Sequence, residues 1–388
     1  MHIFLNALGA RTASGLTYIR NVIPHLNSLG GVRTTIAVHP GLQPEFFRFK
    51  QIGYAELPEL RSTAQRFWFE QMRLPAIVQQ VGADVLISAG NFAVRRSPVP
   101  QILLSGNSLY TSHDFYRDLR DRREYWMWLD TRFRALLARQ SVLWADCTVA
   151  PTQAFADELK RWTAKDVVAI PHGFDRNLFF SDTAPLAPHF RVALDSAAHD
   201  LKLLYVSNYN YFRNFETLFR ALPLIREKLS PRKVRLFITC KLQPGENPGS
   251  YRTQEAAALV RQLQIEDEVV QLGAIPYGQL HHLYRACDLY VTSSYAETFA
   301  HPLVEARACG LRVIASDLAV HREVAGDSAL YFSRFSPEEL AARVLQVASS
   351  QNEVKHPLQS SSKQFSWREH VDQLLALAAS LVEHRVAA

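Results

Sequence analysis

A chain of 388 residues is too long for one ordinary hydrophobic core and predicts two domains. Apolar residues make up 48% of it and charged residues 21%, as in soluble globular proteins, and no apolar run approaches the ~20 residues that a membrane span needs. The net charge of +6 lies wholly within residues 1–180, which hold 21 Lys and Arg against 15 Asp and Glu. This excess either faces an anionic partner, such as phospholipid headgroups or a pyrophosphate-linked acceptor, or is an ordinary solvated surface.

Short β-rich runs alternate with helical patterns, which predicts parallel strands covered by helices on both faces. Strands are expected at residues 2–6, 34–38, 85–88, 102–105, 148–150 and 167–170. After a polar Pro- and Ala-rich stretch, residues 181–200, they resume at 203–206, 234–239, 269–272, 289–292 and 313–315. The predicted fold is α/β with two Rossmann-like, doubly wound domains, residues 1–175 and 176–366. Ligands are expected in the cleft between them, outside the carboxyl ends of the strands.

A loop of glycine and small residues, residues 8–15, follows the first strand and leads into an amphipathic helix. In such a loop, backbone N–H groups can approach a phosphate or a sugar. Ser14 and Gly15 stand at the helix entrance and are candidate ligand-binding residues. The loop lacks the full G-x-G-x-x-G pattern of dinucleotide sites.

An Arg-rich and aromatic segment, residues 115–140, is expected to form a long helix and holds seven arginines. Two interpretations remain open. The segment either contacts an anionic lipid surface, or its Trp and Phe side chains belong to the core and its arginines form a solvated face. No nucleic-acid-binding motif accompanies the charge, so nucleic acid is not an expected partner.

Two carboxylates eight positions apart, Glu297 and Glu305, form the most informative pattern. Glu297 follows a predicted strand, and Pro302 marks the start of the next helix, which contains Glu305. At ~1.5 Å rise per residue, the two carboxylates are expected roughly 12 Å apart along the helix axis. Each can accept hydrogen bonds from hydroxyl groups at one end of an elongated ligand, and the N–H groups of the helix start would meet an anion between them. A nucleotide sugar has this form.

The stretch at residues 297–316 resembles the retaining glycosyltransferases of family four, which have the GT-B fold. The resemblance rests on Glu297, seven residues, Glu305, and then Gly310 followed by the strand at 313–315. It is dense from about residue 201 to 331 and thin before residue 171. It also implies that a C-terminal helix, residues 367–388, crosses back to the first domain.

The resemblance assigns roles in donor binding. It implies that Glu305 binds the ribose hydroxyls and that Glu297 binds the transferred sugar. Arg213 stands at the family's Lys position and would neutralise the diphosphate, so no metal and no other cofactor is expected. Asn208 stands where the family has a second cation. Other residues expected at the donor site are Ser207, Gly273, Phe299, Ala300 and His301.

The first domain lacks the family's catalytic His-Asp pair at its expected place after the fourth or fifth strand. Two candidates remain for this role. Asn107 lies just beyond that place and would give a polar contact to the donor sugar, or the pair has shifted to His113 and Asp114.

The segment at residues 171–175 resembles the family's domain junction. Gly173 is expected in a turn with φ > 0, and His172 is expected to be structural.

The resemblance implies a retaining glycosyltransferase of hexosyltransferase type. It would move a sugar from a nucleoside diphosphate sugar to a hydroxyl of a saccharide or lipid-linked acceptor, in cell-surface polysaccharide or glycolipid assembly. The alternatives are another GT-B enzyme, such as a sugar phosphorylase or sugar-nucleotide epimerase, and a non-catalytic nucleotide-sugar-binding scaffold. Four cysteines without metal or redox spacing and a start without a basic n-region predict a cytoplasmic protein, with the inner face of the membrane as an expected surface partner.

Overall fold

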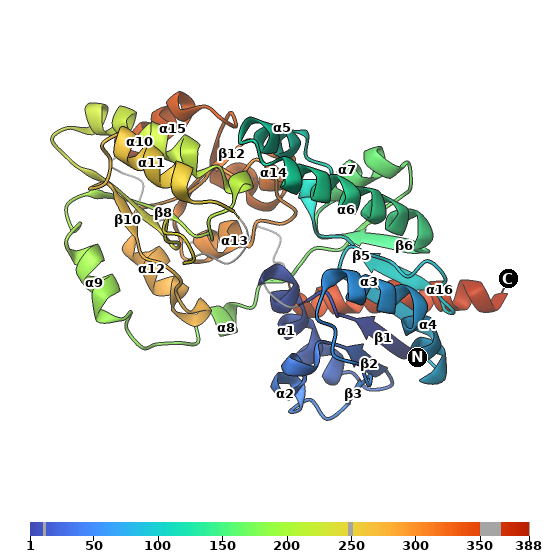
Figure 1. Cartoon of the computed structure of the whole chain (residues 1–388). Helices are drawn as coiled ribbons and strands as arrows, with labels where there is room; N and C mark the ends of the chain where they lie inside the picture. The colour runs from blue at the N-terminus through green and yellow to red at the C-terminus, as the bar shows by residue number, and fades with distance from the viewer. Residues whose placement is uncertain (11–12, 247–250, 350–365, 388) are drawn as a thin grey trace. The chain divides into compact units, whose positions relative to one another are not determined.

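The computed structural model describes residues 1–10, 13–246, 251–349 and 366–387 of the chain (Figure 1). The chain forms two compact units. Unit 1 comprises Met1–Ser112, Leu119–Gly173 and Phe365–Ala388, and unit 2 comprises His113–Asp118 and Phe174–Gln364. This division differs from a boundary at residue 175 in one internal segment, because residues 113–118 associate with unit 2.

Unit 1 contains a sheet of seven parallel strands in the order β3-β2-β1-β4-β5-β6-β7. Its central strands are apolar and almost fully buried because helices cover both faces. The strands are β1 (His2–Asn6), β2 (Arg33–Ala37), β3 (Ile52–Tyr54), β4 (Val85–Ala89), β5 (Gln101–Leu104), β6 (Cys147–Ala150) and β7 (Val168–Ala169).

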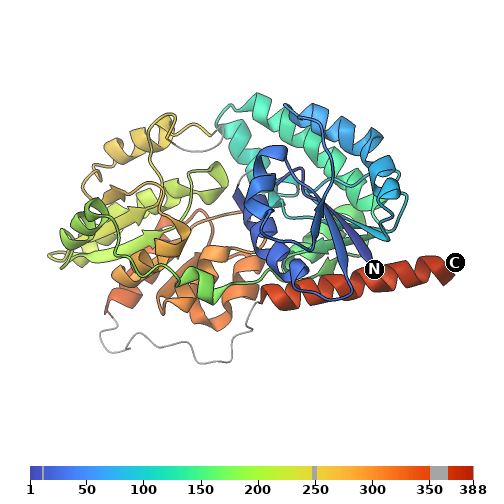
Figure 2. The ribbon, with the colours of Figure 1, turned by 90° about the horizontal axis from the view of Figure 1, so that it is seen from below.

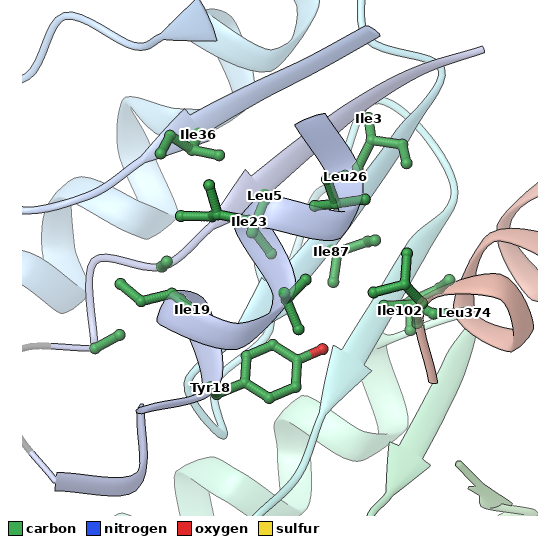
Figure 3. Packing of buried hydrophobic residues seen from close by; sticks show 14 of the residues in the cluster. Ile3, Leu5, Tyr18, Ile19, Ile23, Leu26, Ile36, Ile87, Ile102 and Leu374 are labelled. Atoms are coloured by element: carbon green, nitrogen blue, oxygen red, sulfur yellow. The ribbon is translucent and has the colours of Figure 1, made fainter. Parts of the chain in front are cut away.

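The helices of unit 1 divide between the two faces of this sheet. Ile3, Ile87 and Ile102 point to one face, where they join a buried cluster with α1 and α16 (Figure 3). Phe4 and Leu103 belong to the opposite face, where clusters with α3, α4 and α6 form. The helices are α1 (Ala13–Asn27), α2 (Gln43–Phe46), α3 (Thr63–Met72), α4 (Leu74–Gln80), α6 (Tyr125–Trp144), α7 (Gln153–Thr163) and α16 (Trp367–Ala387), with 3-10 turns at Pro40–Leu42 and Ser108–Tyr110.

The C-terminal helix α16 belongs to unit 1 and is the long red helix of Figure 2. Its buried residues Trp367, Val371 and Leu374 lie in the same cluster as α1. Each fully buried aliphatic side chain of this kind contributes roughly 1.5–3 kcal/mol. The start of α16 also explains Gly173, where an added Cβ would lie 2.1 Å from the Trp367 backbone nitrogen. Gly173 has no positive φ, so the expected turn is wrong and close backbone approach is the reason for glycine.

Unit 2 contains six parallel strands in the order β10-β9-β8-β11-β12-β13. The strands are β8 (Leu201–Tyr205), β9 (Val234–Ile238), β10 (Val269–Gln271), β11 (Leu289–Thr292), β12 (Arg312–Ser316) and β13 (Ala329–Phe332). The helices are α8 (Arg176–Phe179), α9 (Pro188–Asp195), α10 (Phe215–Leu229), α11 (Gln254–Gln262), α12 (Leu280–Ala286), α13 (His301–Ala308), α14 (Ala319–Ala325) and α15 (Pro337–Ser349), with 3-10 turns at Tyr211–Arg213, Tyr277–Gln279 and Gly326–Ser328.

The structure differs from the sequence analysis, or adds to it, in three places. The polar stretch at 181–200 contains helix α9, which buries Phe190 and Leu194. The single helix expected at 115–140 is two helices, α5 (His113–Asp121) and α6, separated at Arg123, whose φ is 57°. The edge strands β3 and β13 were not expected at all.

Candidate functional site

Two loops at the carboxyl edge of the unit 2 sheet pack on each other. One connects β8 to α10, and the other connects β11 to α13. The Ser293 hydroxyl shares its one proton between the carbonyls of Arg213 (3.0 Å) and Asn214 (2.8 Å), and the Tyr295 N–H donates to the carbonyl of Phe212 (2.9 Å). Segments about 80 residues apart in the chain therefore form one polar surface, as the edge of a parallel sheet predicts.

A buried tyrosine holds this surface from the strand side. Tyr205, at the end of β8, is 1% exposed, and its hydroxyl donates to the Arg213 carbonyl at 2.8 Å. The same hydroxyl lies 3.1 Å from the Ser294 hydroxyl oxygen. Asn214 then turns the chain into α10 with a left-handed φ of 52°, a conformation that Asn tolerates better than most residues. The position of the Arg213 backbone is thus determined by several buried groups.

Arg213 and Glu297, both singled out from the sequence, form an ion pair. The Nη1 group of Arg213 donates to Glu297 Oε1 and to Ser294 Oγ, the latter at 3.2 Å. The two side chains are 22% and 9% exposed, so the pair is only partly screened by water. The buried Nε–H of Arg213 has no hydrogen-bond partner within the described residues. The guanidinium as a whole is partly exposed, so its other N–H groups are the ones that a ligand oxygen can reach.

Glu305 lies inside α13 and is 5% exposed. Its Oε2 accepts a hydrogen bond from the hydroxyl of Tyr284, a buried residue of α12, at 2.9 Å. Burial raises the pKa of Glu305 to about 7, and the hydrogen bond from Tyr284 offsets part of that rise. The carboxyl group therefore changes its charge near neutral pH, and hydroxyl donors from a ligand would favour its charged form.

The start of α13 differs slightly from the prediction. The helix begins at His301, one residue before Pro302, and Ala300 is the N-cap residue with φ 62° and no side chain that caps the helix. Glu297 lies in the loop before it. The expected separation of Glu297 and Glu305, roughly 12 Å along one helix axis, assumed that all eight residues are helical. This assumption is wrong, because about half of these residues precede the helix.

Two aromatic rings pack together at this helix start. The rings of Phe299 and His301 have centroids 4.6 Å apart, and Phe299 is 1% exposed. Burial lowers the pKa of the half-buried His301 to about 4, so its imidazole is neutral at physiological pH. A neutral ring can donate one hydrogen bond and accept another.

Other predicted donor residues lie in loops at the same edge of the sheet. The backbone N–H of Ser207 donates to Thr239 Oγ1 at 2.9 Å, and Asn208 is exposed next to it. Gly273 follows β10 with φ 84°, and an added Cβ there would lie 3.2 Å from Cε of Lys241. Lys241 donates to the Gln271 carbonyl at 2.7 Å. The sequence analysis missed this cation, although it follows a predicted strand in the way the other site residues do.

His321 is a second residue that the sequence analysis did not single out. It is fully buried in α14, and its Nδ1 lies 2.8 Å from the carbonyl oxygen of Ser316. Burial, with a contribution from the charge of Arg213, lowers the pKa of His321 to about 4. Its Nε2 has no partner within the described residues. With Nδ1 donating to a carbonyl, Nε2 is left as an acceptor.

The predicted residues of the first half of the chain do not gather in one unit. Asn107 belongs to unit 1, where its side chain accepts from the Leu109 N–H at 3.1 Å. His113 belongs to unit 2 and is exposed, while the neighbouring Asp114 pairs with Arg334 at 3.0 Å. These contacts give Asn107 and Asp114 a structural role in their own units.

The glycine loop of unit 1 is tightly packed at the entrance of α1. An added Cβ on Gly15 would lie 3.1 Å from the Ala10 Cα, a tighter contact than most side chains make, which favours glycine there. Ser14 is the second residue of α1, and residues 11–12 lie outside the described chain.

Near this loop, Asn6 donates from Nδ2 to buried Glu70 at 3.2 Å. Arg66 pairs with the same carboxylate at 3.8 Å. The sequence analysis did not identify this polar group, because its members are distant in the chain.

Neither a membrane-crossing helix nor a metal-binding cluster of His, Cys, Asp or Glu is found in the part of the chain that the structure describes. The expectation that the reaction needs no metal stays a prediction.

Comparison with known proteins agrees with the resemblance. The family model for glycosyl transferases group 1 matches residues 188–367, and the model for Glycosyltransferase Family 4 matches residues 16–178. The chain is a member of the family-four, group 1 glycosyltransferases with the GT-B fold.

Among similar proteins, D-inositol 3-phosphate glycosyltransferase of Corynebacterium aurimucosum is 27% identical over 260 residues, 63% of this chain and 59% of the relative. The same enzyme of Segniliparus rotundus is 27% identical over 61% of this chain and 53% of the relative. The matched segments thus span less than two thirds of these relatives.

Two solved structures share the fold. The Anabaena protein HepE in complex with UDP and glucose has a TM-score of 0.67 at 17% identity and covers 98% of this chain and all of that one. Sucrose-phosphate synthase from Thermosynechococcus elongatus has a TM-score of 0.68 at 18% identity and covers 100% of this chain and 98% of that one.

Proposed function

We propose that this chain is a retaining glycosyltransferase that moves a sugar from a nucleoside diphosphate sugar to a hydroxyl of a saccharide or lipid-linked acceptor. The observation that carries the proposal is the contact of Arg213 with Glu297 at the carboxyl edge of the unit 2 sheet, with Glu305 buried in the helix that follows. A cation paired with one carboxylate, and a second carboxylate in the next helix, suit a ligand with a diphosphate and hydroxyl groups at both ends. Anabaena HepE has been solved with UDP-glucose, which supports this donor class.

The ion pair provides charge balance for such a donor. Glu297 alone would repel a diphosphate, but its pairing with Arg213 makes the net charge of the two side chains zero. The partly exposed guanidinium of Arg213 can still give a charge-assisted hydrogen bond to a phosphate oxygen. Glu297 keeps a second carboxylate oxygen for a hydroxyl group of the transferred sugar.

Glu305 would bind the ribose. Its carboxyl group has one hydrogen bond from Tyr284 and is otherwise surrounded by protein. Two ribose hydroxyls that donate to it would stabilise the carboxylate and lower its pKa from about 7. Donor binding near neutral pH would therefore release part of a proton, which calorimetry in buffers of different ionisation enthalpy can measure.

In the proposed reaction, the acceptor oxygen forms a bond to the anomeric carbon and the bond from that carbon to the diphosphate oxygen breaks. Negative charge grows on the departing diphosphate, where Arg213 stabilises it. The acceptor proton passes to the departing phosphate oxygen, so that no protein base is needed. Positioning and charge stabilisation then supply the rate enhancement.

A panel of UDP, GDP, ADP and dTDP sugars, with EDTA present, tests the donor. A ligand at one hundred times its Kd stabilises the folded state by about 2.7 kcal/mol, which a thermal melt detects. We expect one base to raise the melting temperature, and we expect a saccharide acceptor then to release nucleoside diphosphate with retained anomeric configuration by NMR. No stabilisation by any of them would refute the donor site. Stabilisation without turnover would favour the scaffold, and phosphate-dependent turnover the phosphorylase.

We also propose that the protein works at the inner face of a membrane, where lipid-linked acceptors are found. The charge of unit 1 supports this, since its 21 Lys and Arg outnumber 15 Asp and Glu while unit 2 holds 22 of each.

A further inference from the structure

Helix α6 of unit 1 has several of its large apolar side chains on the outside. Its buried face consists of small or short residues, namely Thr131, Ala135, Ala138, Ser141 and Val142. Its outer face carries side chains that are mostly more than half exposed, Tyr125 (61%), Trp126 (82%), Leu129 (53%), Phe133 (62%), Leu136 (65%) and Leu143 (41%). Trp128, Leu137 and Trp144 of the same helix are half-buried, so its large apolar side chains lie partly inward and partly on the outer face.

Most of these side chains form one stripe. Positions 126, 129, 133 and 136 follow each other at intervals of three and four, which places them on one side of an α-helix. From Tyr125 to Leu136 the stripe is about 17 Å long at 1.5 Å per residue, and the exposed Gln140 separates it from Leu143. Scattered exposed apolar residues are normal on proteins, but a contiguous stripe of this kind marks a surface that binds something.

A second helix of unit 1 also exposes large apolar side chains. Helix α3 covers the same face of the unit 1 sheet as α6 (Figures 1 and 2). Leu86 of β4 lies in the buried cluster with α3 and Leu103 of β5 lies in the cluster with α6, and the pairing of the two strands places both side chains on one face. It exposes Trp68 (58%) and Met72 (62%). Unit 1 therefore offers large apolar side chains from two elements.

The charges around the stripe are mainly positive. Arg132 is exposed on the border of the outer face, and Arg120 and Arg123 are exposed just before α6. The acidic residue in the middle of α6, Asp130, is paired with Arg134 at 2.8 Å. Asp121 is also exposed at the N-terminal end, so the balance there is positive but mixed.

We propose that the outer face of α6, together with Trp68 and Met72, docks onto an anionic lipid surface. Aromatic and aliphatic side chains with flanking arginines, on a helix that is not long or apolar enough to span a bilayer, are what an interfacial helix requires. Trp and Tyr favour the headgroup level. This inference rests on the membrane location proposed above and names the surface that would contact the membrane. It depends on unit 1 alone and not on the donor site.

A second copy of the chain fits this surface less well. Two copies joined by a two-fold axis bring the same patch of each together. The arginines of one copy would then meet those of the other, within a unit whose formal charge is already +6. An anionic bilayer supplies the opposite charge.

Co-sedimentation with vesicles tests the proposal. The full chain is mixed with vesicles of phosphatidylglycerol and phosphatidylcholine, or of phosphatidylcholine alone. The stripe variant combines Trp126→Ser, Phe133→Ser and Leu136→Ser. The matched control combines Leu178→Ser and Val192→Ser, two exposed apolar residues of unit 2. We expect at least about tenfold weaker partitioning for the stripe variant and no change for the control.

A charge variant separates the electrostatic part. Arg120→Glu with Arg132→Glu should weaken binding to the anionic vesicles, and rising salt should weaken wild-type binding, because exposed charges are screened within ~10 Å at 0.1 M. Brominated lipid should quench fluorescence in the wild type more than in Trp126→Phe, which identifies the residue that enters the interface.

Three results would overturn the proposal. They are a wild-type protein that stays in the supernatant, a stripe variant that binds like the wild type, and a wild-type dimer that the stripe substitutions dissociate in sedimentation velocity without lipid. Each variant must keep the wild-type melting temperature and nucleoside diphosphate affinity. Failure of the donor site would abolish that affinity in the wild type as well, so the two failures are distinguishable.

Discussion

Replacing Glu305 with glutamine should remove a pH-dependent cost from the folded state. The wild-type carboxyl group is 5% exposed, and burial raises its pKa to about 7 from an ordinary value of 4.5. Between these values the folded protein keeps a proton that the unfolded chain has lost. The contribution of Glu305 to the free energy of unfolding of the wild type therefore falls as pH rises from 4.5 to 7. Above pH 7 this contribution no longer changes.

The magnitude follows from the shift. A difference of about 2.5 pKa units corresponds to about 3 kcal/mol at 1.36 kcal/mol per unit. Glutamine does not ionise and keeps an oxygen that can accept the hydrogen bond from Tyr284. The Glu305→Gln variant should therefore be about as stable as the wild type near pH 4 and about 3 kcal/mol more stable near pH 8.

Urea denaturation of both proteins, followed by fluorescence and circular dichroism across this pH range, measures the difference. Comparison of the two curves cancels every other titrating group, including the buried Glu70, whose pKa burial also raises. A stability difference that stays flat from pH 4 to pH 8 would refute the reasoning, because Glu305 would then ionise as it does in water. Tyr284→Phe is the companion variant and should raise the pKa of Glu305 further, since it removes the hydrogen bond to the carboxylate.

Three further predictions concern the supports of the two units. Arg213→Ala should destabilise the protein by about 2–3 kcal/mol, because Glu297 is left unpaired at 9% exposure, and adding Glu297→Gln should recover part of this loss in a double-mutant cycle. Gly173→Ala should lower the free energy of unfolding by about 3 kcal/mol or more in urea denaturation, since the new methyl group would overlap the Trp367 backbone. The same change should expose α16 to limited proteolysis, and wild-type stability would contradict the packing described. Ala300→Gly should stabilise by about 1 kcal/mol in the same assay, because its φ of 62° strains any side chain, and a loss of stability would count against that strain.

Most strands could be predicted because long apolar runs bounded by polar residues have few other solutions. Strands β1 and β11 have the predicted bounds, and the other predicted strands differ by one or two residues at one or both ends. The edge strands β3 and β13 have three and four residues and partly polar sequences, so they carry no such pattern. Helix α9 was missed because Pro, Ala and Ser dominate the sequence around it. The burial of Phe190 and Leu194 in the folded protein stabilises this helix, and the sequence does not show that burial.

The site was predictable as a set of residues and not as a set of contacts. Glu297, Glu305 and Arg213 follow predicted strands, but the sequence does not show that Arg213 and Glu297 bond across 84 positions. The partner of Glu305, Tyr284, lies on another helix and looks like an ordinary core residue in the sequence. Periodicity likewise predicts an apolar stripe on α6 but does not show whether the stripe faces the core or the solvent. The interpretation of Trp126 and Phe133 as core residues is wrong.

The central claim is that unit 2 binds the nucleoside diphosphate through Glu305 while Glu297 serves the transferred sugar. Titration calorimetry of the nucleoside diphosphate that stabilises the wild type, with EDTA present, tests it directly in Glu305→Ala and Glu297→Ala, with turnover measured on the same samples. We predict affinity about tenfold to hundredfold weaker for Glu305→Ala, since a hydrogen bond to a charged group is worth about 1.5–3 kcal/mol. We predict wild-type affinity with strongly reduced kcat for Glu297→Ala. Wild-type affinity in Glu305→Ala, or wild-type turnover in Glu297→Ala, would contradict the account.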